Sequence, residues 1–139
     1  MTTSDKGLIH RWFEEVWNKR RQAAIYEMLH PDAPVHGLAG PSGEAIRGPD
    51  GFLPFWQKFT SAFPDIKVTV EAVVVEGDTA AMRCTVRGNH TGKGLGIEPT
   101  NAQVTFTGMA MARIQNGKIM EAWNNFDFLT FNQQVGIVK

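Results

Sequence analysis

A short run near the C-terminus holds the residues best suited to chemistry. Trp123, Asn124, Asn125, Phe126 and Asp127 bring an indole, two amides, a phenyl ring and a carboxyl group within five consecutive residues. Aromatic side chains interspersed with polar groups suit the wall of a small-molecule pocket. The run therefore predicts part of a binding site for a small molecule.

Asp127 has two interpretations, and both can hold at once. It precedes Phe128 and Leu129 at the expected start of a helix, where an aspartate caps backbone N–H groups. It can also act as a base at the mouth of a cavity. In that case the rings of Trp123, Phe126 and Phe128 would raise the pKa of its carboxyl group.

Three further ionisable residues are candidates for catalysis. Arg83 lies within an otherwise apolar strand, so its guanidinium must meet either a ligand oxygen or a carboxylate. A structural ion pair with Glu71 or Glu121 is the alternative to a role in the site. His36 and His90 lie outside the expected helices, and each is either a proton shuttle or a hydrogen-bonded structural residue.

The polar run ends the second strand of a predicted hairpin. Asn116-Gly117 separates two apolar runs, Gln103 to Ile114 and Lys118 to Asn125. Asn-Gly between such runs is the strongest short-range hairpin signal. A closing helix is expected from about Asp127.

The register of this hairpin depends on its turn. A two-residue turn sets Ala110 opposite Trp123, and a glycine bulge at Gly117, which we favour, sets it opposite Ala122. One face then carries Phe106, Gly108, Ala110, Ala112, Ala122, Asn124 and Phe126. Its small residues leave a hollow, and Asn124 supplies an amide. The other face carries Met109, Met111 and Trp123 as a packing or dimer surface.

Helices are expected mainly in the first half of the chain. Apolar residues recur at helical spacing from Leu8 to Trp17, and a second, short helix from Ala24 to Leu29 stops at His30-Pro31. A loop from Gly37 to Gly48 follows a brief extended segment at Val35 and His36. Pro49 to Phe63 then forms a third helix with a stripe of aromatic residues.

Two alternating strands, Ile66 to Val74 and Ala80 to Arg87, precede the hairpin. This order predicts a single α+β domain over residues 1–139, with a curved antiparallel sheet wrapped as a cone and helices packed on one face. The mouth of such a cone is a ligand site. The side chains expected to contact a substrate are Trp17, Trp56, Phe59, Phe106, Ala110 and Phe126.

Composition excludes several classes of function. Fourteen basic residues balance fourteen acidic ones, so neither nucleic acid nor an anionic membrane is an expected partner. The single cysteine, Cys84, is read as a small core residue, and no metal site is expected. No apolar run reaches the ~18 residues of a membrane span, which favours a cytoplasmic protein. Without a phosphate-binding or dinucleotide motif, any reaction is expected to need no cofactor.

Several segments together resemble the SnoaL-like polyketide (ester) cyclase family. They are Arg11 to Asn18 (RWFEEVWN), Ala62 to Asp65 (AFPD), Gly88 to Gly92 (GNHTG), Gly96 to Thr100 (GIEPT), Phe106 to Gly108 (FTG), Gly117 to Asp127 (GKIMEAWNNFD) and Gln133 to Gly136 (QQVG). The resemblance implies the cone-shaped α+β fold of the nuclear transport factor two and ketosteroid isomerase group, usually as a homodimer. It also implies ring closure of a polyketide ester by aldol condensation, without metal or cofactor.

The resemblance places the family's acid/base aspartate at Asn124 and its partner histidine at Ala110, so this chain lacks both groups. Our first hypothesis is a cofactor-free enzyme that acts on a hydrophobic, oxygenated small molecule by proton transfer, cyclisation or isomerisation. Asp127 or a histidine is its base, and Asn124 and Arg83 stabilise an oxyanion. The alternatives are a non-catalytic binding protein and a dimeric interaction module whose cavity is filled.

Overall fold

A computed structural model describes residues 2–40 and 42–138. Five helical segments and six strands follow one another along the chain. In order, they are α1 (Thr2–Arg11), η1 (Trp12–Asn18), α2 (Gln22–Met28), β1 (Pro34–Ala39), β2 (Ala45–Arg47), α3 (Gly48–Ala62), β3 (Lys67–Glu76), β4 (Thr79–Asn89), β5 (Gln103–Gln115), β6 (Lys118–Phe126) and α4 (Phe128–Val135).

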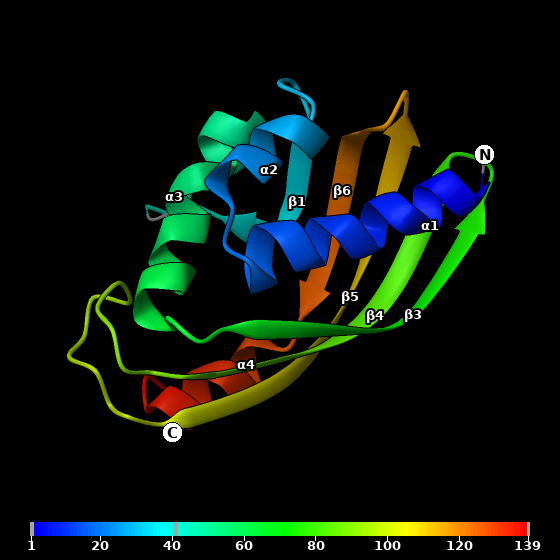
Figure 1. The fold of residues 1–139 in the computed structure, drawn as a ribbon. Coiled ribbons are helices and arrows are strands. Elements are labelled where there is room, and N and C mark those ends of the chain that lie inside the picture. The colour runs from blue at the N-terminus through cyan, green and yellow to red at the C-terminus, as the bar shows by residue number, and fades with distance from the viewer. Residues whose placement is uncertain (1, 41, 139) are drawn as a thin grey trace.

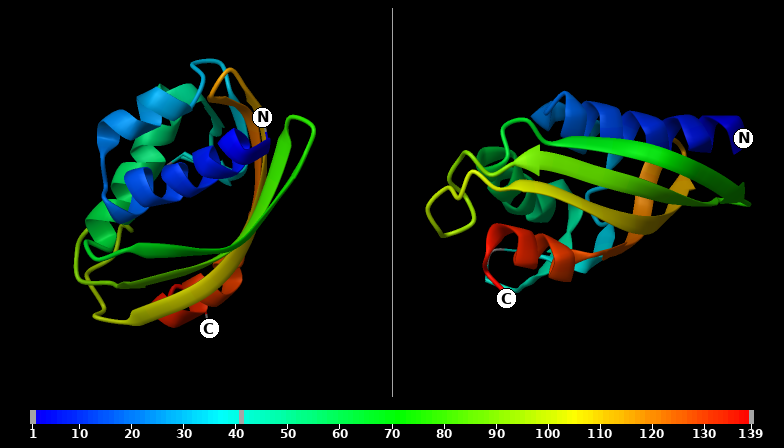
Figure 2. Two further views of the ribbon diagram at one scale, coloured as in Figure 1. Left: turned by 45° about the vertical axis from the view of Figure 1, so that its right-hand side comes forward. Right: turned by 90° about the horizontal axis from the view of Figure 1, so that it is seen from below.

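The strands form one curved, unclosed sheet in the order β2-β1-β6-β5-β4-β3 (Figure 1). Helices α1, α2 and α3 lie across its concave side, and α4 packs on β5 at one end (Figure 2). This confirms the predicted α+β fold with helices on one face. Two details differ: β1 runs parallel to β6, and the expected loop from Gly37 to Gly48 contains β2. Among the described residues, no helix is both long and apolar enough to cross a membrane.

The turn between β5 and β6 is the two-residue type. Gln115 pairs with Lys118, and the intervening Asn116 and Gly117 have φ values of 54° and 73°. Positive φ at both central residues is the backbone geometry that Asn-Gly supplies most easily. The hairpin signal is therefore confirmed, and the bulge expected at Gly117 is wrong.

A bulge does exist, but it lies further along β6. Ile114 pairs with Ile119 while Arg113 pairs with Glu121, which leaves Met120 without a partner. Ala110 consequently faces Asn124, two residues beyond the expected Ala122. Because side chains alternate between the faces of a strand, a shift of two residues keeps every residue on its face. The inner and outer sets expected for the hairpin are therefore correct although the register is not.

The first helix is not uniform. After Arg11 the chain widens into a π-helical turn, in which Lys19 N–H donates to Glu14 C=O over 2.8 Å, five residues back. In a π-helix, residues five apart lie on one face, whereas in an α-helix they diverge. Trp12 and Trp17 are five apart, so the widened turn directs both indoles to the concave side of the sheet. The apolar spacing predicted a helix here but not this change of pitch.

Asn18 fixes the end of the π-helix to the edge of the sheet. Its side-chain oxygen accepts from Val68 N–H at 2.7 Å, and its side-chain nitrogen donates to Val68 C=O at 2.9 Å. Val68 belongs to β3, an edge strand whose backbone groups need such partners. The neighbouring Trp17 is therefore held by its backbone at a set position over the sheet.

Cys84 lies on the inner face of β4 and is fully buried. Burial, with a smaller effect of the Glu71 carboxylate, raises the pKa of its thiol to about 12. The interpretation of Cys84 as a small core residue is confirmed.

Candidate active site in the cone

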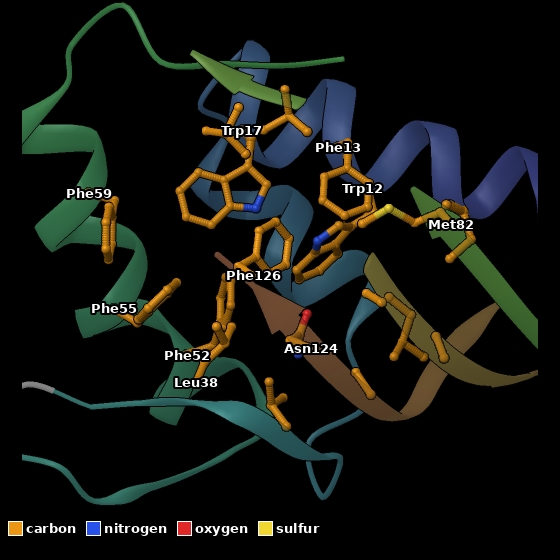
Figure 3. A pocket seen from close by; sticks show the side chains of 18 of the residues that line it. Trp12, Phe13, Trp17, Leu38, Phe52, Phe55, Phe59, Met82, Asn124 and Phe126 are labelled. Atoms are coloured by element: carbon orange, nitrogen blue, oxygen red, sulfur yellow. The ribbon is translucent and has the colours of Figure 1, made fainter. Parts of the chain in front are cut away.

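A cavity lies between the helices and the concave face of the sheet (Figure 3). The cavity opens to solvent on one side and has a volume of about 100 Å³. That is room for several waters or a small ring system. The hypothesis of a dimeric interaction module whose cavity is filled is therefore contradicted.

The helical wall of the cavity is aromatic. Its aromatic residues on η1 and α3 are Trp12, Phe13, Trp17, Phe52, Phe55 and Phe59. The ring of Phe52 lies 5.4 Å from that of Trp12 and 6.1 Å from that of Trp17, the latter edge to face. Rings at these distances and tilts attract one another beyond the burial of area. The rings therefore pack on one another, and the wall offers flat, apolar surfaces to a ligand.

The opposite wall is formed by β5 and β6. Ala110 and Ala112 leave open space there, whereas Gly108 does not. A Cβ atom on Gly108 would lie 2.2 Å from Cδ2 of Phe126, so the Phe126 ring fills the hollow expected at Gly108. On this hairpin, the small side chains of Ala110 and Ala112 border the free volume, and Gly108 does not.

Asn124 is the one polar residue among those that line the cavity within the described part of the chain. Its Nδ2 donates to the backbone C=O of His36 at 3.0 Å. A carbonyl oxygen can only accept, so this bond fixes the orientation of the amide. The amide oxygen points into the cavity in Figure 3 and has no hydrogen-bond partner among the described residues. The atom presented to a ligand is an acceptor, rather than the oxyanion donor expected from the sequence.

Gly37 makes this arrangement possible. Its φ is +86°, and a Cβ atom would lie 1.8 Å from the backbone oxygen of Asn124. Strand β1 therefore approaches β6 more closely at Gly37 than any side chain allows. The approach brings the carbonyl of His36 within reach of the Asn124 amide.

Five of the six residues expected to contact a substrate line the cavity: Trp17, Phe59, Phe106, Ala110 and Phe126. Trp56 does not, and its placement at the cavity is corrected. Its ring is buried, and its indole N–H donates to Val16 C=O at 2.8 Å. Carbonyls in the last turn of a helix lack intrahelical partners, so Trp56 serves the fold at this point.

The structure places Asp127 outside the cavity. It is exposed and caps α4, accepting from Thr130 N–H at 3.0 Å and from the Thr130 hydroxyl at 2.6 Å. The hydroxyl first, and the backbone N–H second, lower the pKa of its carboxyl group. The expected rise in pKa is therefore wrong, because the side chain faces solvent and Thr130 and not the aromatic rings.

Replacing Asp127 separates the cap from catalysis. Asp127→Asn is expected to keep the helix cap and near-native stability at pH 7. Asp127→Ala is expected to lose the cap and to be less stable. Neither change is expected to alter ligand binding or turnover. A carboxyl whose pKa is lowered by folding stabilises the fold above its ordinary value of 3.8, and this advantage disappears as the pH falls through the lower folded pKa. Urea denaturation of both variants from pH 7 to pH 2 measures it. If Asp127→Asn folds normally but loses turnover, the interpretation of Asp127 as the catalytic base would be supported after all.

Arg83 and His36 lie on the outer, convex face of the sheet. Arg83 forms an ion pair with Glu71, which also accepts from the Thr85 hydroxyl at 2.9 Å. His36 contacts Glu121 at 2.8 Å. Both residues thus use their polar atoms in surface pairs, which agrees with the structural alternative for Arg83. The sheet separates them from the cavity, and their placement at the site is corrected.

His90 is fully buried away from the cavity, with its ring 5.4 Å from that of Phe63. Its Nδ1 accepts from Thr100 N–H at 3.2 Å, so a neutral ring carries its proton on Nε2. That Nε2 is the one buried side-chain nitrogen or oxygen without a partner among the described residues. Its expected place beside the substrate is likewise corrected.

No ionisable side chain lines the cavity within the described residues. Trp12, Phe13, Leu38, Phe52 and Phe55 belong to the site and were not predicted as site residues. The spacing of the apolar residues predicted helices that pack on a core. A helix that lines a cavity has the same pattern, so the sequence does not distinguish the two. The described residues also contain no group of three or more His, Cys, Asp or Glu placed to hold a metal ion.

The model of the SnoaL-like polyketide cyclase family matches residues 7–135. The chain belongs to this family. Among solved structures it is similar to IdmH, a candidate polyketide cyclase from Streptomyces antibioticus, with 32% identity, a TM-score of 0.80, and coverage of 95% of this chain and 98% of that one. No protein with a curated functional description matches the chain.

Two more distant structures show the same fold. A candidate SnoaL-like polyketide cyclase from Jannaschia sp. CCS1 has 22% identity and a TM-score of 0.83, and covers 99% of this chain and 95% of its own. AclR of Streptomyces galilaeus, a candidate hydroxylase, has 22% identity and a TM-score of 0.84, with 99% of this chain and 84% of its own covered. This member of the SnoaL-like family carries Asn124 and Ala110 directly opposite each other on the cavity wall.

Proposed function

We propose that the protein promotes ring closure in a hydrophobic, oxygenated molecule of polyketide type that binds inside the cone. The observation that carries this proposal is the wall of the cavity, which combines flat aromatic rings with one amide and no ionisable side chain. Such a wall can fold a flexible chain, hold its reacting ends together and exclude water. Holding reacting groups in place can supply a large share of a rate enhancement.

This mechanism differs from the one expected from the sequence. In an aldol closure, a carbon loses a proton and bonds to a carbonyl carbon, and the carbonyl oxygen gains a proton. The wall has no side chain that can take this proton, so the transfer runs within the substrate or through a bound water. Asn124 then orients an oxygenated part of the substrate and does not act as the base. No cofactor is part of the proposal.

A direct test uses linear oligo-β-keto thioesters of N-acetylcysteamine as substrates. Mass spectrometry and chromatography would follow a product of equal mass, or of a mass lower by one water, that forms faster with the protein than without it. The matched control is the same assay with the Ala110→Phe variant, in which a larger side chain fills the cavity. If the thioesters bind and no product forms faster, the protein is a binding protein rather than an enzyme.

Binding without catalysis is the second candidate. It is favoured by a specific observation: Ala110 and Asn124 occupy the two positions where the family resemblance places an acid/base pair. Saturable binding with an unchanged rate of ring closure in Ala110→His/Asn124→Asp would support it. A gain of turnover in that double variant would show instead that the cavity is competent for chemistry once a base is present.

We further propose that two copies of the chain pair through the outer face of the sheet. Its exposed apolar side chains include Val74, Met109, Met111 and Trp123, with 66%, 57%, 46% and 37% of their surface exposed. Nearby charges are already paired, as in Arg83–Glu71 and His36–Glu121. A neutral apolar face of this kind suits a second copy of itself.

The dimer makes a testable prediction. Met111→Glu is expected to shift the protein from dimer to monomer in sedimentation velocity, because it sets two charges against each other near the centre of an apolar interface. Leu129→Glu, at an exposed position on α4, is the control and should leave the dimer intact. A wild-type protein that sediments as a monomer at micromolar concentration would refute the pairing.

A further inference from the structure

The cavity contains polar atoms that the fold does not use. The indole nitrogens of Trp12 and Trp17 and the amide oxygen of Asn124 have no hydrogen-bond partner among the described residues, whereas the indole of Trp56 is bonded to Val16. Indole N–H groups normally find a partner when buried. The two donors and the acceptor are therefore available for hydrogen bonds to a bound ligand.

These atoms are open to the cavity. Trp12 and Trp17 are each only 8% exposed, yet neither nitrogen is sealed off, because His90 Nε2 is the one sealed and unpartnered side-chain nitrogen or oxygen among the described residues. Figure 3 shows both indoles and the Asn124 amide directed into the same space. The π-helical turn is what brings the two indoles to the same side.

We propose that the cavity selects a flat, apolar molecule with oxygens of two kinds. A carbonyl or ether oxygen accepts from the indoles of Trp12 and Trp17, and a hydroxyl or enol donates to the amide oxygen of Asn124. This rests on the proposed function and names the class of its substrate: an aromatic or conjugated hydroxy-ketone or enolised diketone. An apolar molecule without oxygen would leave all three polar atoms unpaired, which costs binding free energy.

Four naphthalenes of similar size test the inference by equilibrium dialysis. They are naphthalene, 2-naphthol, 2-acetylnaphthalene and 6-acetyl-2-naphthol. The hydroxyl and the acetyl group are each expected to tighten binding roughly 3- to 10-fold. The compound with both groups should bind most tightly.

Variants assign each gain to its atoms. Trp12→Phe and Trp17→Phe keep an aromatic ring and remove the N–H, so each should reduce the gain from the acetyl group and leave that from the hydroxyl. Asn124→Leu should do the reverse. Trp56→Phe is the matched control: it should lower stability, because Val16 C=O loses its donor, without changing the order of the four affinities.

The outcomes separate two kinds of failure. If none of the four compounds binds, the cavity is no ligand site, and the proposed function fails together with the inference. If naphthalene binds as tightly as its oxygenated relatives, or if the tryptophan variants retain the full gain from the acetyl group, the inference fails while the apolar cavity stands.

Discussion

Replacing Ala110 with phenylalanine is expected to abolish ligand binding and turnover in a protein that remains folded. Ala110 lies on β5 opposite Asn124 and lines the free volume of the cavity. A phenyl ring there would occupy the space that the ligand needs and would cover the Asn124 amide. We expect affinity for 6-acetyl-2-naphthol to fall by about 100-fold or more. Because the ring enters existing space, unfolding free energy should change by less than about 2 kcal/mol.

Calorimetric titration and urea denaturation measure the two quantities. Ala72→Phe is the control. Ala72 pairs with Arg83 on the outer face of the sheet, so the substitution adds the same ring away from the cavity. It should bind ligand like the wild type. An Ala110→Phe protein that is folded and retains wild-type affinity would show that the ligand binds elsewhere.

Replacing Gly37 with alanine is expected to cause the largest loss of stability. The change adds a methyl group to a backbone with φ of +86° and sets it 1.8 Å from the backbone oxygen of Asn124. Relieving that overlap would push β1 away from β6 and break the bond from the Asn124 amide to His36. The two effects together should cost about 2–4 kcal/mol, as a strained backbone and a lost hydrogen bond between strands typically do.

Gly43 provides a matched control for Gly37. Its φ is +81°, but a Cβ atom there would meet nothing within 4 Å. Gly43→Ala should therefore show only the cost of the left-handed backbone, about 1–2 kcal/mol. Thermal and urea denaturation of both variants give the difference. Equal losses would mean that the close approach of β1 to β6 does not matter for stability.

Much of the fold could be predicted because it depends on local patterns. Alternation along each strand identifies the sheet, and Asn116-Gly117 fixes a hairpin by its backbone preference. The inner face of that hairpin was right although its register was wrong. Register needs the position of the bulge at Met120, and no residue type marks a bulge of this kind in the sequence.

The candidate site was harder to predict because it depends on the direction of side chains. Asp127, His36 and His90 were predicted as site residues from their residue types and from their positions at strand ends or in loops. Their actual directions follow from a cap on α4, a surface pair with Glu121 and a buried contact with Thr100. Such contacts join residues far apart in sequence, so no local pattern reports them.

Trp12 and Trp17 illustrate the same limit. Their spacing of five residues suggests opposite sides of an α-helical stripe, and both were consistent with a packed core. The π-helical turn, held at its end by the bonds between Asn18 and Val68, changes this geometry. The availability of their indole N–H groups to a ligand becomes evident only from the structure, in which the indole of Trp56 has a hydrogen-bond partner and those of Trp12 and Trp17 do not.

The indole N–H signals of the protein test the central claim most directly. The chain has four tryptophans, so a ¹⁵N-labelled sample gives four such signals in one spectrum. On addition of 6-acetyl-2-naphthol, the signals of Trp12 and Trp17 should move as their donors gain a partner. Those of Trp56, bonded to Val16, and Trp123, on the outer face, should stay in place. If Trp123 moves while Trp12 and Trp17 do not, the ligand binds outside the cone, and the cavity is not the site.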